Sequence, residues 1–236
     1  MNNGYYENLD INFTSALKLY EENYTHNELI EFLKSGNIVQ KQISALRLDG
    51  IYSQNDAEVL LSNLTGQDGK VREAVSLRLV EFMSNPEYLQ FFEGEKYCQI
   101  FLDAIIDING NICRNSICAI SNLKNDAGFY KKFCPMLVDL TNNLLNLIEM
   151  FNFKEGKYKV NKEVFKLYWC LETIYEFYDK INFEDLKNIL LRAKNIQEYT
   201  IREKAAKILS RNLNDKELNQ AREELKNDSN YYVRRF

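Results

Sequence analysis

The chain has 236 residues, a formal net charge of −4 and 45% hydrophobic residues, an ordinary composition for a folded protein. A chain of this length can bury a substantial core, which excludes disorder as a description of the whole. Glycine (9) and proline (2) are scarce. Because strands need turns rich in such residues, we expect long helices joined by short polar links. No segment resembles a signal peptide or a membrane span, so a cytoplasmic protein without a membrane partner is expected.

Apolar residues at helical spacing predict a succession of helices. In chain order these cover 12–22, 25–34, 38–48, 56–64, 71–83, a short turn at 86, 97–106, 111–123, 126–153, 164–178, 183–193, 199–211, 215–226 and a short helix from 231. Pro135 predicts a kink or break near Cys134. The polar, basic segment 151–162 predicts a loop within an irregular region over 124–162.

Histidine and cysteine, the usual zinc ligands, are few in this chain. His26 is the only histidine, and Thr25 with Glu28 predicts a capping box that makes it a first-turn surface residue. The cysteines, at 98, 113, 118, 134 and 170, lie in helical apolar patterns without a metal spacing. We therefore expect reduced, buried thiols, no metal site and no cofactor.

One pattern recurs along the chain: a polar turn, a β-branched residue, then a basic or polar residue that opens an apolar helix. It occurs at 35–48, 66–79, 108–120, 196–209 and, in part, 227–236. The aligned positions are Gln40, Arg72, Arg114, Arg202 and Arg234, spaced by 32, 42, 88 and 32 residues. The interval of 88 fits two units, with 157–171 as a degenerate copy. Such a period is typical of an α-solenoid.

The same segments resemble HEAT repeats over about 25–236. The resemblance is carried by Asp68, Val71, Arg72, Ala74 and Leu77, by Ile201, Arg202, Ala205, Ala206 and Leu209, and by Asp228, Val233 and Arg234. It implies an all-α solenoid of about five to six helical hairpins, forming a single domain over 1–236 whose last repeat, 227–236, is incomplete. It also implies a structural ladder between neighbouring units, made by Asp68, Arg72, Arg202, Asp228 and Arg234.

Charge is distributed unevenly. Residues 1–110 carry 8 basic and 17 acidic side chains, residues 111–186 carry 10 of each, and residues 187–236 carry 12 basic and 7 acidic. An acidic first half favours a basic protein partner, whereas the basic last fifth could contact nucleic acid or an acidic partner. Interleaved signs within 202–204 and 222–224 are typical of solvated helix faces.

Sequence signatures of catalysis are missing: no phosphate-binding glycine loop, zinc motif or nucleophile elbow occurs. We therefore expect a non-catalytic scaffold that binds another protein along a ridge of second helices. The candidate binding residues are Gln40, Arg47, Arg78, Arg114, Lys204, Lys207 and Arg211. The alternative is a nucleic-acid-binding protein similar to the alkylpurine DNA glycosylases, with Trp169, Tyr175 and Asp179 in place of their aromatic and acidic residues. A third hypothesis, a lyase or chaperone for a bound cofactor, rests only on analogy with bilin lyases.

Overall fold

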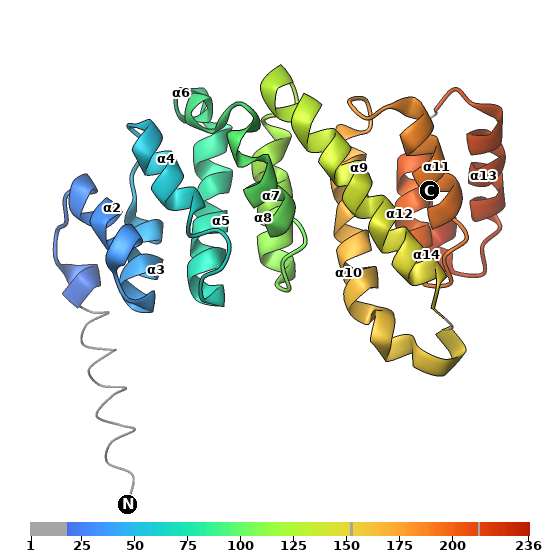
Figure 1. The fold of residues 1–236 in the computed structure, drawn as a ribbon, viewed down its shortest axis with the longest axis horizontal. Coiled ribbons are helices and arrows are strands. Elements are labelled where there is room, and N and C mark those ends of the chain that lie inside the picture. Colours follow the sequence, from blue (N-terminus) through green and yellow to red (C-terminus); the bar gives the residue numbers. More distant parts are fainter. Residues whose placement is uncertain (1–17, 152, 212) are drawn as a thin grey trace, which may run out of the picture. The chain divides into compact units, whose positions relative to one another are not determined.

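The chain is all-helical wherever its structure is described (Figure 1). A computed structural model describes residues 18–151, 153–211 and 213–236, with the side chains of 153–160 left aside. The helices are α2 (His26–Ser35), α3 (Ile38–Arg47), α4 (Gln54–Leu61), α5 (Gly69–Ser84), α6 (Pro86–Leu89), α7 (Cys98–Ala104), α8 (Gly110–Ser121), α9 (Ala127–Glu149), α10 (Phe153–Phe177), α11 (Phe183–Ala193), α12 (Tyr199–Leu209), α13 (Lys216–Lys226) and α14 (Tyr231–Arg234), with 3₁₀ turns at Gln90–Phe92 and Glu95–Tyr97. Among these helices, none is long and apolar enough to cross a bilayer.

Most helix predictions are confirmed, and so is the capping box. The Thr25 side chain accepts from the Glu28 N–H while Glu28 accepts from the Thr25 N–H. Residues 18–21 are helical, and the rest of the helix expected over 12–22 lies outside the described residues.

One local prediction is wrong, and of the kink or break expected near Cys134 the break does not occur. The segment 151–162 does not form a loop, since α10 begins at Phe153. Its lysines and its one glutamate favour a helix, and one glycine costs only about 1 kcal/mol there. Helix α9 does not break at Pro135 but continues from Ala127 to Glu149. The proline removes one backbone hydrogen bond, a cost that the many buried residues of α9 offset.

The chain divides into two compact units whose segments alternate in sequence. Unit 1 comprises Met1–Glu93, as far as it is described, together with Asn109–Asn122. Unit 2 comprises Gly94–Ile108 and Leu123–Phe236. The short helix α7 therefore belongs to unit 2, whereas α8, which follows it in the chain, belongs to unit 1.

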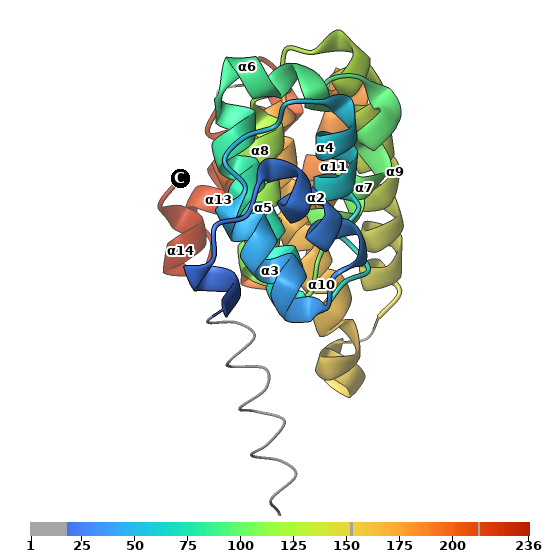
Figure 2. The same cartoon turned by 90° about the vertical axis from the view of Figure 1, so that its left-hand side faces the viewer.

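Unit 1 is built from two rows of helices. Helix α2 packs on α3 and α4, α3 packs on α5, and α5 packs on α8. Figure 2 shows α2 and α4 on one side of α3 and α5. A buried polar contact links α2 to the end of α4 within one row, because Asn63 donates to the carbonyls of Leu33 (3.0 Å) and Val59 (2.8 Å). The periodic positions Val71 and Leu79 of α5 are buried, as their spacing predicts.

Unit 2 also has two rows of helices, and α9 and α10 are its two longest. Helices α9, α11 and α13 follow one another in one row, and α10, α12 and α14 in the other; neighbours within each row pack together. In the first row Arg192 of α11 reaches Glu149 of α9 at 2.8 Å, and Lys187 reaches Asp215 at 2.9 Å, at the start of α13. Four phenylalanines pack together in the core: Phe101, Phe129, Phe133 and Phe177, with Phe129 stacked on Phe133 at 4.8 Å.

The thiols are free, and four of the five are buried: Cys98, Cys113, Cys134 and Cys170. Cys118 is exposed, so the expectation that all thiols are buried is wrong at this position. Cys118 lies on the solvent-exposed face of α8, whereas its neighbours Ile117, Ala119 and Ile120 are buried.

Candidate functional site

The candidate binding residues of unit 1 mostly serve the local structure. Gln40 completes a capping box by accepting from the Asn37 N–H at 2.9 Å. Arg47 donates to the carbonyls of Leu19 and Glu22, and Arg78 donates to the Leu48 carbonyl and contacts Glu81. Arg114 is exposed, and among the described residues its guanidinium contacts only the side chain of Asn111, at 3.2 Å.

Three of the four repeat arginines, Arg72, Arg202 and Arg234, share one contact that spacing alone did not reveal. Arg202 donates to the carbonyls of Ile196 and Gln197, six and five residues earlier, at 2.9 and 2.6 Å. Arg234 donates to the carbonyls of Asp228 and Ser229 at the same two offsets, at 2.6 and 2.8 Å. Arg72 donates to the Gln67 carbonyl, five residues earlier. Each of these arginines thus stabilises the turn that precedes its own helix. Its charged guanidinium donates to backbone carbonyls that would otherwise lack a hydrogen-bond partner.

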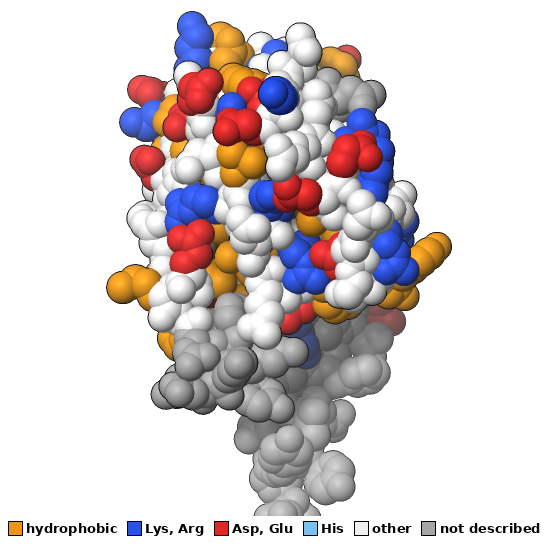
Figure 3. Space-filling model, turned by 90° about the vertical axis from the view of Figure 1, so that its right-hand side faces the viewer, with side chains coloured by type: hydrophobic (Ala, Val, Ile, Leu, Met, Phe, Trp, Pro, Cys, Tyr) orange, Lys and Arg blue, Asp and Glu red, His pale blue; other side chains and the backbone are white. Residues whose placement is uncertain are grey.

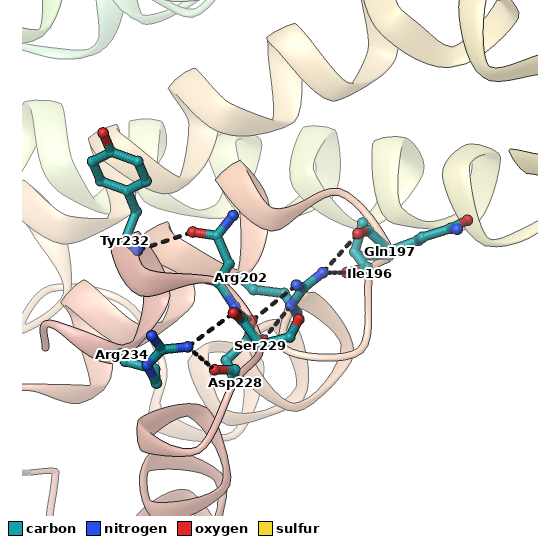
Figure 4. A network of polar contacts seen from close by, with 8 residues as sticks. Ile196, Gln197, Arg202, Asp228, Ser229, Tyr232 and Arg234 are labelled. Carbon is teal, nitrogen blue, oxygen red and sulfur yellow. Dashed lines mark hydrogen bonds and ion pairs between the residues drawn. The ribbon is translucent and has the colours of Figure 1, made fainter.

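Arg202 also links the turn before α12 to the turn before α14 (Figure 4). Its Nε and Nη2 contact the two carboxylate oxygens of Asp228, in the latter turn, at 2.6 and 3.1 Å. The contact with Arg202 holds the pKa of Asp228 below its usual range. Burial acts to raise that pKa, but its effect is smaller. Asp68, in contrast, caps α5 by accepting from the Lys70 N–H at 2.9 Å.

Three candidate binding residues of unit 2 converge on one surface. Lys204, Lys207 and Arg211 follow each other along one side of α12 and its end, and each lies over a tyrosine of α10 or its end. Lys204 Nζ lies 4.3 Å from the ring centre of Tyr168, and Lys207 Nζ lies 4.0 Å from that of Tyr175. The Arg211 guanidinium lies 4.0 Å from Tyr175 and 5.4 Å from Tyr178. We call these six residues the cation–tyrosine face.

Glu172 sits at the centre of this face, between two of the cations. Lys207 donates to Oε1 at 2.7 Å, and Lys204 lies 2.8 Å from Oε2, as an ion pair rather than a well-aligned hydrogen bond. Burial acts to raise the pKa of Glu172, but the two ammonium groups outweigh it and lower that pKa. Burial likewise acts to lower the pKa of the buried Lys204, and the contact with Glu172 raises it instead.

Arg211 differs from its neighbours on the face because no carboxylate is paired with it among the described residues. Its side chain is exposed, and within the described structure its guanidinium lies against the two tyrosine rings. Stacking occupies the face of a guanidinium and leaves the N–H groups of its edge able to donate to a carboxylate or phosphate.

No role was assigned from the sequence to Tyr168, Tyr178 or Glu172 of this face, and Tyr175 was offered only for the nucleic-acid alternative. The signal was present: Tyr168, Glu172 and Tyr175 recur at spacings of four and three along a helix, and Lys204, Lys207 and Arg211 at three and four. The sequence alone does not show that these two stripes face each other, because that depends on the packing of α10 on α12.

His26 is half-buried between carboxylates rather than free on the surface. Its Nε2 lies 3.1 Å from Asp56 and its Nδ1 lies 3.3 Å from Asp49, while its ring contacts that of Tyr52 at 4.6 Å. Asp56 also accepts from the N–H groups of Tyr52 and Ser53, both at 3.0 Å. Burial opposes the charge of Asp56, but these donors outweigh burial and lower its pKa.

The residues offered for a glycosylase-like site do not share one. Trp169 is 8% exposed, and Asp179 forms an ion pair with Lys124 at 2.7 Å. Trp169 lies in α10, whereas Asp179 follows the end of that helix at Phe177, which is about 12 Å farther along the helix axis than Trp169. No cluster of three or more potential metal ligands occurs in the described parts of the chain.

The basic character of the C-terminal part does not produce a single-sign patch on the side of α13. Figure 3 shows Lys and Arg side chains intermingled with Asp and Glu side chains on that side of unit 2. Short contacts explain the mixing, because Lys187 and Lys194 of α11 pair with acidic side chains of and beside α13.

Comparison with known proteins adds no assignment. No protein-family model matches this chain, and no curated protein is significantly similar to it.

Proposed function

We propose that this chain is a non-catalytic, HEAT-like α-solenoid scaffold that binds another protein through the cation–tyrosine face. The observation that carries this proposal is the exposed Arg211 guanidinium, held on Tyr175 and Tyr178 with no carboxylate partner in the described structure. A pre-oriented guanidinium binds a carboxylate with little loss of side-chain freedom. The partner that fits is therefore a protein segment carrying Asp or Glu.

Several features support the solenoid part of the proposal. Each unit has two rows of helices, the helix pairs of unit 2 follow in chain order, and Arg72, Arg202 and Arg234 make equivalent turn contacts. We propose that these arginines, with Asp68 and Asp228, keep successive turns in register. We further propose a reducing, cytoplasmic location, on the ground that the five cysteines are free.

Affinity capture with matched variants tests the binding proposal. The tagged full chain, its Arg211→Ala variant and its Lys216→Ala variant would be used on extracts of the source organism, with and without nuclease. Lys216 is an exposed cation at the start of α13 and controls for the lost charge. We expect one stoichiometric protein partner that resists nuclease. For the purified pair, we expect about tenfold weaker binding by Arg211→Ala, an intermediate loss by Arg211→Lys, and no change by Lys216→Ala.

Nucleic acid is the second candidate, favoured by the excess of 12 basic over 7 acidic residues in 187–236. It ranks second because lysine and arginine side chains of the same unit already lie over Tyr168, Tyr175 and Tyr178, where bases would stack. Recovery of nucleic acid that disappears with nuclease or salt, without a protein partner, would reverse this order.

A further inference from the structure

Unit 2 contains a pocket where the first half of α9 meets the turn that joins α10 to α11. Its volume is about 270 Å³. Since a water molecule takes about 30 Å³ of liquid, this space suits a ligand of about ten non-hydrogen atoms, the size of a free amino acid. We call it the α9–α11 pocket, and its lining includes Lys131, Pro135, Val138, Lys180, Ile181 and Asp185.

The buried part of the lining is apolar. Val138 and Ile181 are 6% and 8% exposed, and the buried Cys134 also lines the pocket. An aliphatic group of a ligand would gain free energy by leaving water at this wall. A ligand without any apolar group, such as inorganic phosphate, would lose hydration there without compensation. The pocket therefore favours a ligand with an aliphatic portion.

The more exposed part of the lining carries charges of both signs. Lys131 and Asp185 are exposed, and within the described parts of the chain they form no ion pair with each other or with another residue. Lys180 adds a second ammonium group, 3.7 Å from Asp179. Because Asp179 lies closer to Lys124, at 2.7 Å, one carboxylate serves two lysines and leaves one positive charge uncompensated. The pocket thus offers both a cation and an anion to one ligand.

Pro135 gives the lining a further acceptor. A proline has no N–H, so the carbonyl of Lys131 lacks the donor that a helix normally supplies four residues later. Both residues line the pocket. A ligand with a donor group can therefore pair with this carbonyl as well as with the Asp185 carboxylate.

We propose that the α9–α11 pocket binds a free amino acid with an aliphatic side chain. The carboxylate of the ligand pairs with the ammonium groups of Lys131 and Lys180, and its own ammonium group donates to Asp185 and to the Lys131 carbonyl. Its side chain covers Val138 and Ile181. Only a free amino acid carries both charges on one carbon, since each terminus of a protein chain carries one of them. The site does not involve the cation–tyrosine face.

Calorimetric titration of the full chain with four ligands tests this proposal. L-Leucine is compared with 4-methylpentanoate, which lacks only the ammonium group, with 3-methylbutylamine, which lacks only the carboxylate, and with glycine, which lacks the side chain. Leucine should bind, and each of the other three should bind at least about tenfold more weakly, since each loses one charged or apolar contact. No binding of leucine at millimolar concentration overturns the proposal, and so does binding of any of the other three as tight as that of leucine.

Two variants with matched controls test the charged contacts. Asp185→Asn should weaken leucine binding several-fold and leave 4-methylpentanoate unchanged, whereas Glu184→Gln, one residue earlier in the same turn, should change neither. Lys131→Met should weaken both ligands, and Lys132→Met, at an exposed neighbour outside the lining, should weaken neither. Equal effects of Asp185→Asn and Glu184→Gln would contradict the proposed placement of the ammonium group. The four ligands are compared on the unaltered chain, so a folding defect in a variant would not obscure that result.

Discussion

Arg202 donates two hydrogen bonds to the Asp228 carboxylate, from Nε at 2.6 Å and from Nη2 at 3.1 Å. Its remaining nitrogen, Nη1, donates to two backbone carbonyls of the turn that precedes α12. Both side chains are mostly buried, with 16% and 10% exposed. Arg234 then donates to the backbone carbonyl of Asp228 at 2.6 Å. A single aspartate therefore ties the turn before α12 to the turn before α14.

Arg202→Ala should lower the free energy of unfolding of unit 2 by about 2–3 kcal/mol, because Asp228 loses its bidentate partner and two carbonyls lose a charged donor. Arg202→Lys should recover only part of this, since an ammonium cannot reproduce the fork. Urea unfolding followed by circular dichroism measures both. The control is Lys216→Ala, an exposed position of α13. Equal stability of Arg202→Ala and Lys216→Ala would show that the link is not stabilising.

Glu172→Gln should destabilise unit 2 by about 2 kcal/mol at neutral pH, because Lys204 is buried and would lose its counter-charge. The pKa of Glu172 is lowered from its ordinary value of 4.5. Its stabilising effect is therefore complete above that value and is lost as pH falls through the lower folded-state pKa. The difference in unfolding free energy between the two proteins should shrink below about pH 4.5. A difference that grows on acidification would contradict the assigned role of Glu172.

Asp56→Ala should destabilise unit 1 by about 2 kcal/mol, because it removes one acceptor of the α4 capping box and the partner of His26 Nε2. Asp56→Asn keeps an acceptor for the N–H groups of Tyr52 and Ser53 and should cost about half as much. Thermal unfolding of the two variants beside the unaltered chain provides the comparison. If both variants cost the same, the charge of Asp56 rather than its capping geometry would carry the effect.

The sequence predicted the helices and caps better than it predicted their contacts. Local signals placed the Thr25 capping box and the buried stripe of α5 correctly, since caps and periodicity act within a few residues. The repeat alignment also selected Arg202 and Arg234, whose equivalence is now visible in their contacts. It could not predict that Lys207 lies on Tyr175, because that contact joins residues more than thirty positions apart on α12 and α10.

The errors have physical causes of the same kind. Segment 151–162 was expected as a loop from its polarity and glycine, although helix propensity favoured the start of α10. For Arg47 and Arg78, which the sequence offers as binding residues, it did not show that both guanidinium groups donate to backbone carbonyls at the ends of neighbouring elements. The sequence shows that an arginine can donate hydrogen bonds, but the packing of the helices decides which acceptor its guanidinium contacts.

Cys118 should be the one thiol of the folded chain that reacts rapidly with a thiol reagent. It is exposed, whereas Cys98 and Cys134 are buried, and burial raises the pKa of their thiols to about 11 and about 12. The thiolate is the reactive form, so these two cysteines combine poor access with very little thiolate at neutral pH. Brief alkylation followed by peptide mass mapping should label Cys118 alone, and Cys118→Ser should abolish the fast phase. Labelling in urea should reach the remaining cysteines. Fast native labelling of Cys134 would show instead that α9 opens readily around Pro135, which precedes the buried Leu137.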